Sequence, residues 1–333
     1  MNHPQASEHK TISLALQGGG AHGAFTWGVL DRLLEDPRIS FDAISATSSG
    51  ALNALALTQG WISGGREGAR TCLDVLWQRI AGHPQAGAWI FGSRVHAAEP
   101  AAQNLYRYFS SRQIKPASVN PVSQIAEVMF DFEQLRAESP FPLHLAATRV
   151  RDGALILFGP ERLGIDALLA STCLPQILAP ICIDGEHYWD GGWAGNPALE
   201  PLLAVGRNHS ILCVLVQTLK HVEVPTTPEQ IATRMGELGF TSAFLRELRS
   251  LIMLREAIGE STASDQWQTH LKQLEINLLE PGEPLQNFKD KAASGSAIGF
   301  LTTLRDHGRH CAAAWLADPQ RHRITRESPI LRT

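Results

Sequence analysis

The feature that most restricts the fold of this chain is a glycine-rich loop that follows an apolar segment near the N-terminus. The residues from Thr11 to Leu16 are β-branched or apolar, and Gly18-Gly19-Gly20-Ala21-His22-Gly23 comes directly after them. The next segment, Phe25 to Leu34, carries apolar residues at the spacing of a helix that packs on a sheet. The pattern therefore predicts a buried strand, a tight turn and a helix.

A second apolar run, Phe41 to Ala46, also breaks sharply, at Ala46-Thr47-Ser48-Ser49-Gly50. This sequence differs from the G-x-S-x-G nucleophile turn by one methyl group, because Ala46 takes the place of the first glycine. Ser48 is therefore the candidate nucleophile. Ser49 is the rival, although its frame lacks both glycines. The alternative interpretation of Ser48 is an N-cap for the helix that follows.

Strand and helix patterns alternate through the rest of the chain, and we expect one α/β domain over residues 1–333. Strand-like runs cover 143–148, 154–158, 181–189 and 211–216, and the third has a hairpin turn at Asp184-Gly185. The expected fold is a three-layer α/β/α sandwich with a core over about 11–220 and a C-terminal helical extension over about 228–320. Residues 82–121 lack a clean period and are expected to form either a cap over the site or a surface excursion.

Asp190-Gly191-Gly192 follows the second arm of the predicted hairpin. A serine hydroxyl needs a positioned base, and the Asp190 carboxylate is the candidate for that role; the alternative is a turn residue before glycines. Adjacent glycines allow backbone N–H groups to converge on an oxyanion, and a helix that starts at the loop adds its positive end. The candidate oxyanion-hole residues are Gly18, Gly19, Gly20 and Gly23.

The glycine loop also fits G-x-G-x-x-G, which is typical of dinucleotide-binding folds. That interpretation needs an acidic residue at the end of the second strand. Asp42 lies at about the right distance, but it precedes the apolar run instead of following it. The serine turn would have no role in a nucleotide site, so ester chemistry is favoured.

The three motifs together resemble those of the patatin-like phospholipase family, of the bacterial type: G-G-G-x-R/K-G, G-x-S-x-G and D-G-A/G. The resemblance extends to Ala170–Pro175 and to the helical stretch after Phe240. It implies an α/β-hydrolase-like fold and a dyad of Ser48 and Asp190, with no metal and no cofactor. Two residues depart from the family pattern: His22 stands where Arg or Lys is usual, and Ala46 replaces a glycine.

The expected activity is that of a serine acyl hydrolase that cleaves carboxylic esters of lipids. Two alternatives stay open: an acyltransferase or thioesterase that acts on thioesters with a catalytic histidine, and a non-catalytic lipid-binding scaffold. Dependence on a histidine after Asp190 would favour the first alternative. The histidines available for such a triad are His209, His221, His270, His307 and His310.

Composition narrows the partners and the location. The formal net charge of -4 and the spread of the 29 Lys and Arg residues argue against a nucleic-acid partner. The N-terminus has no apolar secretory segment, and the five cysteines are scattered, so a reducing, cytoplasmic location is expected. A lipid or ester is the expected substrate. The sequence leaves open both a transient contact with a membrane surface and the oligomeric state.

Overall fold

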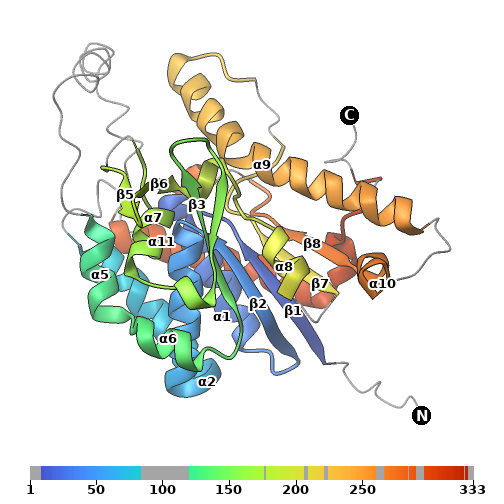
Figure 1. The fold of residues 1–333 in the computed structure, drawn as a ribbon, viewed down its shortest axis with the longest axis horizontal. Helices are drawn as coiled ribbons and strands as arrows, with labels where there is room; N and C mark the ends of the chain where they lie inside the picture. Colours follow the sequence, from blue (N-terminus) through green and yellow to red (C-terminus); the bar gives the residue numbers. More distant parts are fainter. Residues whose placement is uncertain are drawn as a thin grey trace.

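A mixed sheet forms the centre of the molecule (Figure 1). The computed structural model describes residues 9–83, 120–175, 178–205, 209–220, 224–259, 266–283, 285–289, 296–325 and 327–328. The strands in this part of the chain are β1 (Lys10–Leu16), β2 (Ile39–Thr47), β3 (Leu143–Arg149), β4 (Leu155–Phe158), β5 (Ile181–Ile183), β6 (Glu186–Asp190), β7 (Ser210–Val214) and β8 (Glu275–Leu279). Their order across the sheet is β5-β6-β3-β2-β1-β7-β8, and β4 pairs with β3.

Strands β3, β2, β1, β7 and β8 run parallel, whereas β6 runs antiparallel to β3. The carboxyl ends of the parallel strands therefore meet at one edge of the sheet. Ligands of open α/β sheets bind at this edge, because the loops that leave the strands converge there.

Helices cover both faces of the sheet. They are α1 (Gly23–Leu34), α2 (Ser49–Gly82), α5 (Pro121–Met129), α6 (Phe132–Glu138), α7 (Ile165–Ser171), α8 (Glu200–Val205), α9 (Pro228–Gly259), α10 (Gln266–Gln273) and α11 (Ala297–Ala317). Short 3-10 turns include η1 (Gly20–His22) and η4 (Gly191–Trp193). Helix α2 is kinked at Gly64 and Gly65, where the backbone leaves helical angles.

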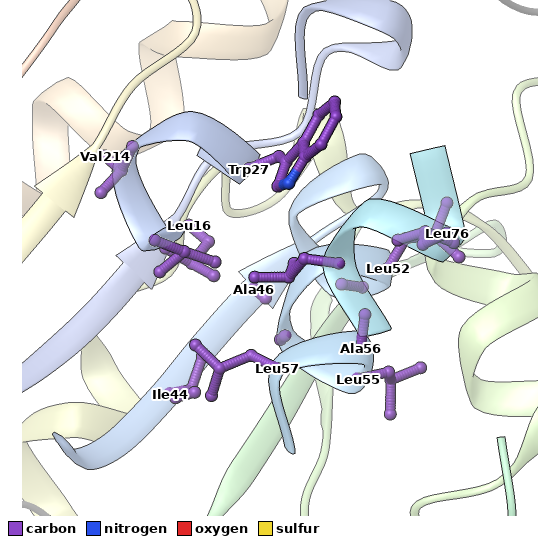
Figure 2. Close-up of a cluster of buried hydrophobic side chains, with 14 of the residues drawn as sticks. Leu16, Trp27, Ile44, Ala46, Leu52, Leu55, Ala56, Leu57, Leu76 and Val214 are labelled. Atoms are coloured by element: carbon purple, nitrogen blue, oxygen red, sulfur yellow. The ribbon is translucent and has the colours of Figure 1, made fainter. Parts of the chain in front are cut away.

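Side chains of the central strands alternate between two buried cores, as the period of a strand requires. One core lies against α1, α2 and α11, and Figure 2 shows Leu16, Ile44 and Ala46 of the sheet with side chains of α2. The opposite core contains Ala15, Ala43, Ile211 and Cys213, packed with α8, α9 and α10. The predicted three-layer α/β/α architecture is thus confirmed.

The C-terminal region differs from the expected run of helices. Residues Glu275–Leu279 form β8, a parallel edge strand that pairs with β7 over its whole length. This strand has only five residues between two helical patterns, so periodicity alone does not separate it from a helix. Helix α11 packs on α1, and a Cβ on Gly308 would lie 2.1 Å from the Phe25 carbonyl oxygen. The C-terminal region therefore completes the sheet and one helical layer.

Two short helices, α5 and α6, were not predicted from the sequence. Each begins at a side-chain cap: Asn120 accepts from the Val122 N–H, and Asp131 accepts from the Glu133 and Gln134 N–H groups. The predicted cap or surface excursion falls mostly on residues 84–119, which lie outside the described residues. Among the helices that the structure does describe, none combines the length and apolar character needed to cross a bilayer.

Candidate active site

The glycine loop and the serine turn meet at the carboxyl edge of the sheet. They follow β1 and β2, which are parallel neighbours with Leu16 paired to Ala46. The Gly18 backbone lies directly against the serine turn: a Cβ on Gly18 would be 2.5 Å from the Ser48 Cβ and 2.6 Å from the Thr47 carbonyl oxygen. Only a residue without a side chain allows this approach.

The Ser48 backbone is held in a conformation that is rare for a residue with a side chain. Its φ is 55° and its ψ is -121°, between the end of β2 and the start of α2. Strain of this kind costs roughly 1–3 kcal/mol and persists where the surroundings enforce it. The Ser48 N–H donates to the Ser171 Oγ at 3.0 Å. Ala46 is fully buried within β2, so its methyl group is accommodated without loss of the sharp turn.

Asp190 is fixed at the end of β6 by its backbone. Its N–H donates to the Cys173 carbonyl oxygen at 2.8 Å, and its carbonyl oxygen accepts from the Thr148 hydroxyl at 2.8 Å. The side chain is fully buried. Oδ1 accepts from the Gly192 N–H at 2.8 Å. Oδ2 is also buried and accepts no hydrogen bond within 3.5 Å from any described residue.

The surroundings of Asp190 bring the pKa of its carboxyl close to neutral pH. Burial raises its pKa to about 7, while interactions with the Ser48 side chain and the Gly192 N–H act in the opposite direction. Strand register brings the two predicted residues together, although they lie 142 positions apart in the sequence: Thr47, next to Ser48, pairs with Ala146 of β3, and Asp190 pairs with Ala147. No hydrogen bond of 3.5 Å or less joins the Ser48 hydroxyl to Asp190 Oδ2. A carboxyl with a pKa near 7 can exchange a proton with a hydroxyl neighbour at ordinary pH.

Some backbone N–H groups of the glycine loop donate hydrogen bonds within the protein, and others do not. The Gly18 N–H donates to Asn196 Oδ1 at 2.7 Å, and the Gly19 N–H donates to Ser49 Oγ at 3.0 Å. The Gly23 N–H donates back into η1, to the carbonyl oxygens of Gly20 and Ala21. Among the predicted glycines, Gly20 thus retains a donor without a partner in the described chain, and the Ala21 N–H is in the same position.

Two buried amide side chains, which sequence reasoning missed, hold the loop in place. Asn196 also donates through Nδ2 to the Gly18 carbonyl oxygen at 3.2 Å, so both backbone groups of Gly18 are bound. Gln17 accepts from the Val216 and Gln217 N–H groups at 2.7 and 3.1 Å. These contacts join residues about 180 or more positions apart, so no local pattern could have revealed them.

The histidines do not complete a triad in the described part of the chain. His209 lies just before β7, at the opposite edge of the sheet, where its ring packs 4.6 Å from that of His270. The His307 ring lies beside Phe25 and within 2.8 Å of the Pro281 carbonyl oxygen. His310 is exposed on α11. His221 lies outside the described residues.

An aromatic pair forms a wall beside the acidic turn. A Cβ on Gly192 would lie 2.2 Å from the Phe240 ring, and the Trp193 and Phe240 rings make an edge contact at 4.6 Å between centroids. Phe240 belongs to α9. The first half of this helix is therefore attached to the turn that carries Asp190.

Comparisons with known proteins give one family match. A model described as patatin-like phospholipase matches residues 14–203, more than half of the chain, and this range contains the glycine loop, Ser48 and Asp190. No curated protein matches the chain significantly. Among solved structures, VipD from Legionella pneumophila is similar at 16% identity and a TM-score of 0.45, over 96% of this chain and 68% of VipD. The ExoU–SpcU complex from the type III secretion system of Pseudomonas aeruginosa aligns at 17% identity and a TM-score of 0.27, over 98% of this chain and 74% of the matched chain.

Proposed function

The chain belongs to the patatin-like phospholipase family, whose members are lipid ester hydrolases, and we propose that it cleaves carboxylic esters of lipids with Ser48 as nucleophile and Asp190 as base. The observation that carries this proposal is the strand register that places Ser48 and the buried Asp190 on either side of the end of β3, with Gly18 packed against Ser48. The sharp backbone turn at Ser48 supports it further, because this turn lifts a side chain out of the strand toward the edge of the sheet.

In the first step, Ser48 Oγ attacks the ester carbonyl carbon while Asp190 accepts the hydroxyl proton. The carbonyl π electrons move to oxygen, and the tetrahedral intermediate collapses with loss of the alcohol, which takes the proton from Asp190. Water then attacks the acyl-serine, again with Asp190 as base. The acid is released and the Ser48 hydroxyl is restored.

The oxyanion that forms in both steps needs N–H donors that are not already engaged. We place the Gly20 and Ala21 N–H groups in this role, because the Gly18, Gly19 and Gly23 N–H groups donate within the protein. The bonds of Gly18 and Gly19 keep the loop against the serine turn, so these glycines act as supports. The oxyanion hole proposed here thus keeps one of the predicted glycines as a direct donor.

The proposal extends to domain organisation and location. We propose a single domain, since β8 and α11 join the same sheet and helical layer as the family-matched region. The five cysteines, all described, form no disulfide, which supports a proposed reducing, cytoplasmic environment.

Hydrolysis of a short soluble ester and of a phospholipid, measured side by side, tests the activity. Ser48→Ala should abolish both, and Asp190→Asn should lower kcat roughly 10²- to 10⁴-fold. Ser49→Ala tests the rival nucleophile: it removes the hydroxyl that accepts from the Gly19 N–H, so it should lower the rate through the loop but leave turnover measurable. Full activity in Ser48→Ala would refute the nucleophile assignment, and activity that depends on a histidine would favour the acyltransferase or thioesterase alternative.

A further inference from the structure

The first three turns of α9 carry an exposed apolar stripe. Nearly every described residue from 228 to 239 is exposed, and in Figure 1 this half of the helix extends beyond the sheet and its covering layers. Ile231, Met235 and Leu238 are 43%, 68% and 47% exposed. Large apolar side chains so placed on a surface helix mark a contact site.

The three side chains share one side of the helix. At about 100° per residue, Ile231, Met235 and Leu238 lie within about 60° of one another, on the side opposite the buried Phe244. The stripe therefore points away from the core of the protein. The stripe is thus distinct from the face of α9 that packs on the protein core.

The same side of α9 continues with positive charge. Arg246 and Arg249 follow at the same helical spacing, and both are exposed. Neither makes an ion pair with any residue in the described ranges. An apolar segment followed by free cations is the pattern of a helix that lies on an anionic lipid surface.

The stripe is connected to the candidate active site. Phe240, two residues after Leu238, packs its ring on Gly192 and Trp193, next to Asp190. Phe240 lies about 200° around the helix from Leu238, so it faces Gly192 while the stripe faces outward. A surface that contacts the stripe would therefore lie on the far side of α9 from Asp190, about one helix diameter (roughly 10 Å) away.

We propose that the outward face of α9 adsorbs the protein to lipid bilayers with anionic headgroups. Ile231, Met235 and Leu238 enter the boundary between headgroups and acyl chains, while Arg246 and Arg249 pair with headgroup phosphates. This inference rests on the proposed function, because a lipid substrate is the reason for the protein to bind a bilayer. Bilayer binding itself is measured without catalysis. A second copy of the chain is a poorer occupant, because three partly exposed side chains cannot supply the roughly 800 Å² per partner of a standard protein interface.

Binding is tested by co-sedimentation of the full chain with vesicles, in the Ser48→Ala background so that the lipids stay intact. Vesicles of phosphatidylcholine that contains phosphatidylglycerol are compared with pure phosphatidylcholine. The triple change Ile231→Gln, Met235→Gln and Leu238→Gln should lower partitioning on the order of 1000-fold, at about tenfold for each inserted side chain. Val128→Gln is the matched control, since Val128 is 65% exposed on α5, away from the stripe.

The charge arm uses Arg246→Gln with Arg249→Gln. Partitioning should fall about 30-fold on the anionic vesicles, at roughly 1 kcal/mol for each arginine, and stay unchanged on pure phosphatidylcholine. In the active protein, both sets of variants should lose hydrolysis of vesicle phospholipid and keep hydrolysis of a soluble short ester. Unchanged melting temperatures confirm that the variants fold.

The outcomes separate this proposal from the proposed function. If the triple variant binds vesicles as strongly as Val128→Gln does, the adsorption proposal is overturned, even if the protein hydrolyses the soluble ester. So would a wild-type dimer that the triple variant converts to monomer without any vesicle binding, because a second copy would then cover the stripe. Stripe-dependent binding by a protein that hydrolyses no ester would support adsorption and refute the catalytic assignment instead.

Discussion

The replacement of Asp190 by asparagine should change how the stability of the protein depends on pH. The wild-type carboxyl is fully buried, and burial raises its pKa from the ordinary 3.8 to about 7. At 1.36 kcal/mol per pH unit, this interval corresponds to about 4 kcal/mol. The asparagine side chain of the variant carries no charge at any pH, so its burial has no such dependence.

The sign follows from proton binding. Below pH 3.8 the carboxyl is protonated in both the folded and the unfolded protein, and ionisation imposes no cost. Between pH 3.8 and about 7 the unfolded chain releases the proton while the folded protein retains it, so the stability of the wild type falls as pH rises. Above about pH 7 both forms are ionised and the loss is complete. Asp190→Asn should therefore gain about 4 kcal/mol relative to the wild type between pH 4 and pH 8.

Urea unfolding over a pH series measures this difference, since the other titrating groups are common to both proteins and cancel. Asp306→Asn is the control for the removal of an exposed carboxyl, because the Asp306 side chain is 62% exposed. The reasoning fails if the free energies of unfolding of Asp190→Asn and wild type keep a constant difference across the series. A divergence of opposite sign would also contradict it.

Three further predictions concern the same site. The kcat/KM of the wild type should fall tenfold per pH unit below about 7 and level off above it, because the base must be ionised; a pH-independent rate would count against Asp190 as base. Asn196→Ala should lower kcat about 10- to 100-fold with little change in KM, as it removes both bonds that hold Gly18; steady-state kinetics equal to wild type would show that the loop needs no such support. Gly18→Ala should lower kcat, and it should lower the free energy of unfolding by about 1–3 kcal/mol or more, because its Cβ would crowd the serine turn. Gly236→Ala on α9 is the control: a Cβ there would have no atom within 4 Å, so this variant should be as stable as the wild type or more stable. Equal denaturation midpoints for the two variants would contradict the crowding at Gly18.

Much of the fold could be predicted from the sequence because the signals are local. Each predicted strand from Thr11 to Val216 lies within or overlaps a strand of the structure, and the hairpin turns at Asp184 and Gly185, both with positive φ. Apolar runs and glycine turns are set by residues next to each other in the chain. The edge strand Glu275–Leu279 was missed because a five-residue run between two helical patterns does not display the period of a strand.

The candidate site shows the same division. The glycine loop, Ser48 and Asp190 stand out because each needs a particular residue type at a particular spacing. Asn196 and Ser171 have no such signature, and their roles come only from contacts across the folded chain, to Gly18 and to the Ser48 N–H. The state of individual N–H groups is equally invisible in the sequence, which is why all the loop glycines looked alike as oxyanion donors.

Covalent labelling tests the central claim most directly. A fluorophosphonate probe phosphonylates a serine only when that hydroxyl is activated by a neighbouring base, and peptide mass spectrometry identifies the modified residue. The adduct should form on Ser48 in the wild type and in Ser49→Ala, and it should be absent in Ser48→Ala. An adduct on another residue, or no adduct in a folded wild-type protein, would contradict the account.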